Sequence, residues 1–464
     1  MPQNNIQNGT KQNGVKPQEA PEGITKITVG GYKSIAQEQS IEIRPLTILA
    51  GANSSGKSSI MQPLLLMKQT LEAPYDPGAL RLDGPDVKVT STSQLFSKTL
   101  SNTLGSIFTS GITCAAANPL DYSSACKVQF VQSTMPGISI RQAEYVLGNR
   151  QVLIHEGMTQ GQIKPILSSS LLKSALSGRL SIARERCFLA VTSHYEPAAD
   201  ENSYAQEGSE EYARSTSYNS WQPAGVIPSF LLGAIHVPGL RGNPERTYPV
   251  TAVGERFPGL FQSYVASIIS HWQSSNDVDK LARLNGELMR LGLTSVVTAV
   301  PINDTQVEIL VGRTLRSARQ DTVSIADVGI GVSQTLPVLV ALLAAKPGQL
   351  VYIEQPEIHL HPRAQTAMAQ VLADAAMRGV RVVAETHSSL LLLGIQTLVA
   401  EGKLPPELVR LHWFTRGDEG ATTIQSADLG RDGAFGNWPE DFDDVTLGAQ
   451  SRYLDAADSY AMRG

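Results

Sequence analysis

One short stretch constrains the fold more than any other part of the chain: residues 46–59 read LTILAGANSSGKSS. An apolar run stops at a glycine and is followed by the helical pattern MQPLLLMKQTL, which favours a buried parallel strand that leads into a helix. Residues 51–58 fit the spacing G-x-x-x-x-G-K-[ST]. Glycines at this spacing let backbone N–H groups point at phosphate oxygens, and the helix adds its positive end. The stretch therefore predicts a phosphate-binding loop within an α/β fold.

The side chains of this loop have separate expected roles. We expect Lys57 to reach the β- and γ-phosphates of ATP, and Ser58 to place its hydroxyl on Mg²⁺. A chance glycine–lysine turn would not need a strand before it and a helix after it. The residues expected to contact the nucleotide are Gly51, Ala52, Asn53, Ser54, Ser55, Gly56, Lys57, Ser58 and Ser59.

Composition excludes several classes of protein. The chain has 464 residues, 42% of them hydrophobic, which is enough for a large core and two or three domains. Its net charge of −5 argues against a uniformly basic nucleic-acid-binding surface. The cysteines, Cys114, Cys126 and Cys187, lack metal-ligand spacing, so we expect a reducing cytoplasm and no zinc. No apolar run approaches about 18 residues, so we expect no membrane segment.

Changes in pattern along the chain indicate its organisation. The polar start predicts disorder, short alternating segments in the middle predict antiparallel strands, and apolar helical patterns return after them. The predicted division is a disordered tail at 1–22, the first part of a nucleotide-binding lobe at 23–80, an inserted, mainly antiparallel region at 81–227 with a mobile loop at 201–223, the second part of the lobe at 228–427 and a C-terminal tail at 428–464.

A second candidate motif is DVGIGVSQ at residues 327–334, directly before an apolar helix. Two glycines and a hydroxyl at the start of a helix form a pocket suited to anions. A simple helix cap at Ser333 would explain the same residues. The motif taken alone leaves both interpretations open.

A third motif, LVYIEQPEIHLHP at residues 350–362, is an apolar strand that ends in carboxylates. Acids at the carboxyl edge of a parallel sheet are suited to hold Mg²⁺, so we expect Glu354 to hold the metal directly or through water. Gln355 follows, and an amide can orient water but cannot accept its proton. Glu357 is therefore the first candidate for the catalytic base and Glu354 the second. His359 and His361 are two residues apart, and this spacing on a strand or turn is weak evidence for a metal site. We favour a structural or dimer-contact role for both.

These motifs resemble a known family. Residues 30–34, GGYKS, followed by the phosphate loop, resemble the opening of ABC-type head domains of the SMC, RecF and OLD class. The run IEQPEIHLHP and the tail DLGRDGAFGNWPEDFDD resemble stand-alone prokaryotic ABC/AAA-like ATPases found in phage-defence modules. The resemblance implies an ABC-type P-loop ATPase head, in which a mixed sheet is flanked by helices and carries an inserted α+β arm.

The resemblance also implies roles for individual residues. In ABC-type ATPases a signature turn reaches across a dimer to the γ-phosphate held by the other subunit, and Gly331, Ser333 and Gln334 are similar to that turn. His387, which ends the buried run VRVVAETH, is similar to the switch histidine that senses the γ-phosphate. Related ATPases usually carry an acid at the position of Gln355, so the departure suggests slow turnover.

The function implied is an ATP-binding and ATP-hydrolysing switch or sensor in the cytoplasm. It would form a homodimer or higher homo-oligomer through its ATP sites and control a separate effector, a nuclease or a toxin, in antiviral defence. Two alternatives stay open: a maintenance ATPase that clamps DNA, and a scaffold that binds ATP with little hydrolysis.

Overall fold

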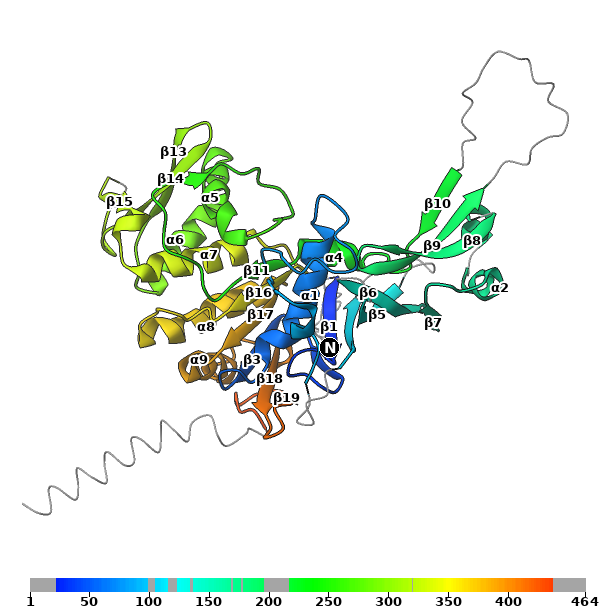
Figure 1. Cartoon of the computed structure of the whole chain (residues 1–464). Coiled ribbons are helices and arrows are strands. Elements are labelled where there is room, and N and C mark those ends of the chain that lie inside the picture. Colours follow the sequence, from blue (N-terminus) through cyan, green and yellow to red (C-terminus); the bar gives the residue numbers. More distant parts are fainter. Residues whose placement is uncertain are drawn as a thin grey trace, which may run out of the picture.

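The computed structural model describes residues 22–98, 105–115, 123–133, 137–167, 170–176, 178–195, 217–318 and 320–436 (Figure 1). Nearly all of the tail predicted at 1–22 lies outside these ranges, as do residues 201–216 of the predicted loop and residues 437–464 of the predicted C-terminal tail. No helix in the described ranges is long and apolar enough to cross a membrane.

A largely parallel sheet of six strands forms the centre of the molecule, in the order β11-β16-β17-β3-β18-β19. Its pairings are parallel from β11 to β18, and β19 is added antiparallel. Strands β3 and β17 are buried along their whole length, as expected for a parallel sheet covered on both faces. The strands are β3 (Leu46–Gly51), β11 (Ile235–Val237), β16 (Leu350–Glu354), β17 (Arg381–Thr386), β18 (Val409–Arg416) and β19 (Thr422–Ala427).

Helices and a second sheet cover the two faces of this central sheet (Figure 1). Alternate residues of β3 belong to different cores: Leu46 and Ile48 to one, Leu49 to the other. The first core is built mainly with α5 (Val265–Ser274), α6 (Val278–Arg290), α7 (Ile330–Ala344), α8 (Pro362–Met377) and α9 (Ser389–Ala400). The second contains α1 (Lys57–Leu71), α4 (Ile227–Gly233) and strands of an antiparallel sheet.

The antiparallel sheet joins the start of the chain to its middle region, in the order β2-β1-β4-β5-β6-β7. Because β4 pairs with β1, the middle region continues a sheet that the first strands begin. These strands are β1 (Gly23–Gly30), β2 (Gln39–Glu42), β4 (Ile107–Ala115), β5 (Ser123–Gln132), β6 (Ile138–Leu147) and β7 (Arg150–Ile154), with α2 (Gln160–Ile163) and α3 (Ser170–Ala175) following. A three-stranded sheet extends from it, formed by β8 (Arg179–Glu185), β9 (Phe188–Tyr195) and β10 (Ser217–Trp221).

A small antiparallel sheet packs against α5 on the other side of the molecule (Figure 1). It consists of β12 (Tyr248–Pro249), β13 (Val297–Asn303), β14 (Gln306–Gly312) and β15 (Thr322–Ser324). The predicted α/β class, with a mixed sheet flanked by helices, is confirmed. The predicted segment boundaries stay a prediction.

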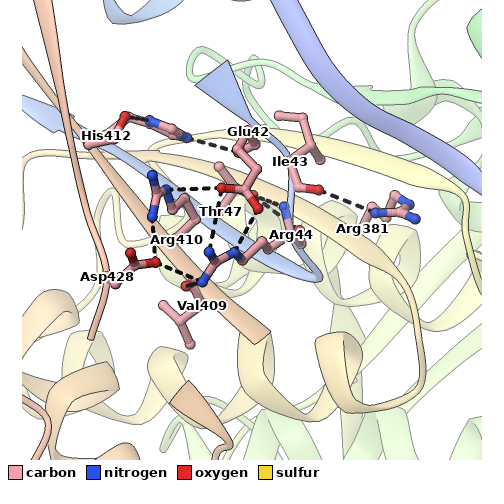
Figure 2. A network of polar contacts seen from close by, with 10 residues as sticks. Glu42, Ile43, Arg44, Thr47, Arg381, Val409, Arg410, His412 and Asp428 are labelled. Atoms are coloured by element: carbon pink, nitrogen blue, oxygen red, sulfur yellow. Dashed lines mark hydrogen bonds and ion pairs between the residues drawn. The ribbon is translucent and has the colours of Figure 1, made fainter. Parts of the chain in front are cut away.

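A polar network joins β2 to β18 and to the end of β19 (Figure 2). Arg44 Nε lies 3.0 Å from Glu42 Oε1, and Arg44 Nη1 lies 2.9 Å from Asp428 Oδ1. Arg410 binds the same two carboxylates. His412 Nε2 donates to the Glu42 carbonyl at 2.8 Å, and burial lowers the pKa of His412 to about 4. The network ties the two large sheets together next to the first residues of β3.

Candidate functional site

The phosphate loop needs both of its glycines at the positions where the sequence places them. Gly51 has φ 139° and Gly56 has φ 103°, in the region of backbone conformation that favours glycine. A Cβ at Gly51 would lie 2.3 Å from the Phe414 carbonyl oxygen, and one at Gly56 would lie 2.4 Å from Thr422 Oγ1. The loop is therefore fixed against β18 and β19 as it turns from β3 into α1.

Lys57 lies across the loop that precedes it. Its Nζ donates to the carbonyl oxygens of Gly51, at 3.1 Å, and Ala52, at 2.8 Å, and the side chain is 3% exposed. Burial lowers the pKa of Lys57, while the charges of Glu385 and Glu357 act in the opposite direction. The ammonium group is thus held by neutral carbonyls, close to acids, at the place where phosphate oxygens are expected.

Ser58, the first helical hydroxyl after Lys57, faces an acid from a neighbouring strand. Its Oγ donates to Glu385 at 2.8 Å from Oε2 and 3.1 Å from Oε1, and Tyr352 donates its hydroxyl to the same carboxylate at 2.9 Å. Burial raises the pKa of Glu385, and the hydrogen bond from Ser58 offsets part of that rise. A hydroxyl and a carboxylate at the carboxyl edge of the sheet are the oxygen ligands that Mg²⁺ uses beside phosphates.

These groups fit Mg²⁺ better than a metal held by protein ligands alone. The described residues contain no cluster of three or more His, Cys, Asp or Glu side chains able to hold an ion. Mg²⁺ takes only one or two protein ligands when phosphates and water supply the others. Ser58 and Glu385 meet that requirement, because Glu385 is within hydrogen-bond distance of Ser58.

One cavity of about 920 Å³ collects most of the predicted phosphate-loop residues. Its walls include Gln355, Glu385 and His387 from the ends of β16 and β17, and Arg416 from the end of β18. Lys33 and Gln94 also line this cavity, whereas Tyr32, the neighbour of Lys33, is fully buried and does not. The phosphate-loop residues in its lining are Asn53, Ser54, Gly56, Lys57, Ser58 and Ser59, while Gly51, Ala52 and Ser55 do not line it.

Glu354 points elsewhere, although it is the register partner of Glu385 in the neighbouring strand. Its carboxylate lies 3.2 Å from His236 Nε2 and accepts the Gly239 N–H at 3.0 Å, and Glu354 is absent from the cavity lining. His236 Nδ1 in turn lies 3.0 Å from Asp86 Oδ1. Burial opposes a charge on His236, but the two carboxylates outweigh it and raise the pKa of the imidazole.

Glu357 faces a second cavity, of about 310 Å³, which shares Gln355 and His387 with the first. Its Oε1 accepts the Thr386 hydroxyl at 2.6 Å and the His387 N–H at 3.2 Å, while Oε2 is buried without a partner in the described residues. The side chain is 7% exposed, and burial raises its pKa despite these hydrogen bonds. Burial and the charge of Lys57 lower the pKa of His387.

Gln355 has a strained backbone between the two cavities. Its φ of 47° lies in the left-handed region, which is uncommon for a residue other than glycine. The Gln355 N–H donates to the Glu385 carbonyl at 2.7 Å and fixes this conformation. Gln355 lines both cavities in this conformation.

The signature-like residues lie outside both cavities of their own chain. Gly331, Ser333 and Gln334 occupy the first turns of α7, and none of them lines either cavity. Ser333 Oγ donates to the Ile330 carbonyl at 2.9 Å, and the Gln334 amide donates to the Gly242 carbonyl at 2.7 Å. Their contact with nucleotide stays a prediction that requires a second copy of the chain.

Two residues at the site had no role in the sequence interpretation. Glu385 lies near the end of a buried strand, as Glu354 does, so the same signal, an acid at the carboxyl end of a strand, was present for it. Asp86, the partner of His236, carries no such signal, because it lies in a loop and its contacts come from distant segments.

A comparison with models of known protein families matches most of the chain. A family model described as "AAA domain, putative AbiEii toxin, Type IV TA system" matches residues 46–393. No curated protein matches.

Similar solved structures are heads of SMC proteins. The SmcHead bound to the C-winged helix domain of ScpA is 12% identical with a TM-score of 0.47, covering 88% of this chain and 98% of that chain. The Smc head domain with an extended coiled coil bound to the C-terminal domain of ScpA, derived from Pyrococcus furiosus, is 11% identical with a TM-score of 0.47, covering 88% and 96%. The SMC head domain from Thermotoga maritima is 11% identical with a TM-score of 0.40, covering 88% and 100%. At these values the similarity carries no argument about activity.

Proposed function

Because the chain belongs to the AAA-domain family whose description names the AbiEii toxin and type IV toxin–antitoxin systems, we propose that it is a Mg²⁺-dependent ATPase that acts as a dimeric switch. Two copies would close on ATP and control a separate effector, a nuclease or a toxin, in antiviral defence. The observation that supports the ATPase step is the single cavity that joins the phosphate loop to Gln355, Glu385 and His387.

The phosphate loop supplies binding. Backbone N–H groups of the loop and of the first turn of α1 are suited to phosphate oxygens. Lys57, whose present partners are two neutral carbonyls, can turn to the β- and γ-phosphates without losing an ion pair. Ser58 and Glu385 would hold Mg²⁺, with Glu354, the acid expected from the sequence, one strand away. The ion would neutralise charge on the transferred phosphoryl group.

Hydrolysis requires a group that orients water and one that takes its proton. Gln355 would orient the water, since this residue lines both cavities. Glu357 is the group that we assign as base, since its Oε2 has no partner in the described residues and its pKa is raised by burial. The Thr386 hydroxyl and the His387 N–H fix its other oxygen. His387 lines both cavities, and in this proposal it would sense the γ-phosphate.

The position of the signature-like turn supports the proposal of a dimer. Gly331 and Ser333 are partly exposed and line neither of the two cavities beside the phosphate loop, so a second copy can reach them, whereas Gln334 is buried behind them. ATP held between two such surfaces would favour the closed dimer, and hydrolysis would release it. Control of an effector and a role in defence extend this proposal through the family description.

Phosphate release from ATP tests the proposal. Wild type should hydrolyse ATP slowly, Lys57→Ala should abolish binding, and Glu357→Gln should bind ATP without turnover. Absence of turnover in the wild type would instead favour an ATP-binding scaffold. Duplex DNA binding that requires ATP and falls steeply with salt would favour a DNA clamp.

A further inference from the structure

Arg241 connects two parts of the site that are far apart in the sequence. It lies in the loop after β11 and is 6% exposed. Its Nη2 donates to the carbonyl oxygens of Glu354 at 2.7 Å and Gln355 at 3.2 Å, and its Nη1 donates to the carbonyl oxygen of Gln334 at 3.1 Å. One guanidinium group therefore holds the end of β16 and the start of α7 together.

The partners of this guanidinium are unusual for a buried cation. Within the described residues its hydrogen bonds go to main-chain carbonyls. Burial lowers the pKa of Arg241 to about 10, and the charges of Glu357 and Glu354 offset only part of that effect. A planar fork with fixed donors can span two elements in a way that a single ammonium cannot. The contact of Arg241 with the two elements therefore depends on the shape of its guanidinium group as well as on its charge.

Further contacts fasten the same loop to the start of α7. The Gln334 amide donates back to the Gly242 carbonyl at 2.7 Å. At the surface, Arg246 Nη2 lies 2.7 Å from Asp327 Oδ1. A displacement of the turn at 327–334 would therefore carry the loop at 239–246 with it.

We propose that Arg241 is a positioning residue that transmits contact at the signature-like turn to Gln355, so that a second copy closing on this turn places the water-orienting amide of the same chain for hydrolysis. The inference rests on the proposed dimeric ATPase and assigns the link between its two sites. It predicts that a change at Arg241 alone lowers ATP turnover while ATP binding and dimerisation are kept.

The test uses the full chain with Arg241→Met, which removes the fork, and Arg241→Lys, which keeps the charge but cannot span both elements. Arg378→Met is the matched control, because Arg378 is half-buried and, like Arg241, donates to main-chain carbonyls, those of Leu342 near the far end of α7 and Asp374. ATP affinity, ATP-dependent dimerisation by light scattering, kcat and thermal unfolding are measured for each.

Both Arg241 variants should bind Mg·ATP within about threefold of wild type and still dimerise, with kcat roughly 10- to 100-fold lower. Arg378→Met should keep the wild-type kcat. The inference is overturned if the Arg241 variants turn over ATP like Arg378→Met, or if they lose ATP binding in step with kcat, which would indicate a merely structural role. A wild type with neither turnover nor an ATP-dependent dimer would refute the proposed function instead.

Hydrogen exchange of the wild type gives a readout that needs no variant. Adding a non-hydrolysable ATP analogue at dimerising concentrations should slow exchange at 239–242 and 355–357 together with 329–334. Protection of 329–334 alone would contradict the link.

Discussion

Two neighbouring glutamates should respond in opposite ways to the same isosteric change. Glu354 and Glu385 are register partners on β16 and β17, and each can be replaced by glutamine without a change in size. One carboxylate faces Ser58 and the cavity, whereas the other faces His236. The pair separates the acid expected from the sequence from the acid that the geometry favours.

Glu385→Gln should leave the nucleotide-free protein at least as stable as the wild type. Burial raises the pKa of Glu385, so its charge is unfavourable before a cation arrives, and the amide removes that charge. Loss of a group that holds or orients a metal ligand typically weakens metal affinity about 10- to 100-fold. The Mg²⁺-dependent part of ATP affinity should fall by about this factor.

Glu354→Gln should destabilise the protein and affect Mg²⁺ less. Burial alone would raise the pKa of Glu354, but the hydrogen bond and charge of His236 outweigh burial. The net effect is a lowered pKa, so the charged form of Glu354 is favoured. Glutamine would leave the His236 imidazolium with Asp86 as its remaining charged partner. Weakening a hydrogen bond to a charged group costs about 1.5–3 kcal/mol, which should lower Tm by a few degrees.

The assay combines thermal unfolding without nucleotide and ATP titration in Mg²⁺ or EDTA, with Glu401→Gln, a change at an exposed residue, as control. A stabilised or unchanged Glu385→Gln with weak Mg²⁺ dependence, and a destabilised Glu354→Gln with normal Mg²⁺ dependence, would support the assignment. The reverse pattern would refute it and restore Glu354 as the metal acid.

Three further predictions concern single residues. Lys57→Met should weaken ATP binding by about 3–6 kcal/mol, because roughly two hydrogen bonds from a charged donor are lost. In calorimetry the variant should then bind ATP no better than AMP. A folded variant with the ATP affinity of the wild type would contradict this prediction. Hydrolysis should fall as pH drops through the raised pKa of Glu357, because only the carboxylate accepts a proton, and Glu357→Gln should remove turnover at every pH. Burial lowers the pKa of His412 from 6.5 to about 4, so protonation favours the unfolded chain and stability should decline by up to about 3 kcal/mol from pH 6.5 to pH 4; His412→Gln should flatten that decline in denaturant titrations.

The sequence was sufficient for the phosphate loop because its chemistry is local. Gly51, Gly56 and Lys57 are positioned by a strand, a tight turn and a helix that follow one another directly. The structure adds the reason why both glycines are needed, namely the close approach of Phe414 and Thr422 from distant strands. No periodicity in the sequence indicates those neighbours.

The acids could not be assigned in the same way. Glu354 and Glu385 both lie at the carboxyl ends of buried strands, and what distinguishes them is the partner, His236 or Ser58, that each one contacts. His236 lies 354 − 236 = 118 positions from Glu354. Such pairings are set by the order of strands in the sheet, which apolar patterns do not reveal.

The central place of β3 has a consequence for how the chain is made. Its two neighbours in the sheet, β17 and β18, begin at residues 381 and 409, so the strand that carries the phosphate loop has neither partner until most of the chain has left the ribosome. Until then both edges of this apolar strand are open to wrong pairing. The sheet forms only when β3 pairs with strands that lie more than three hundred residues further along the chain. Nascent chains of this protein should therefore depend on chaperones, and a fragment that ends before β17 should aggregate rather than fold.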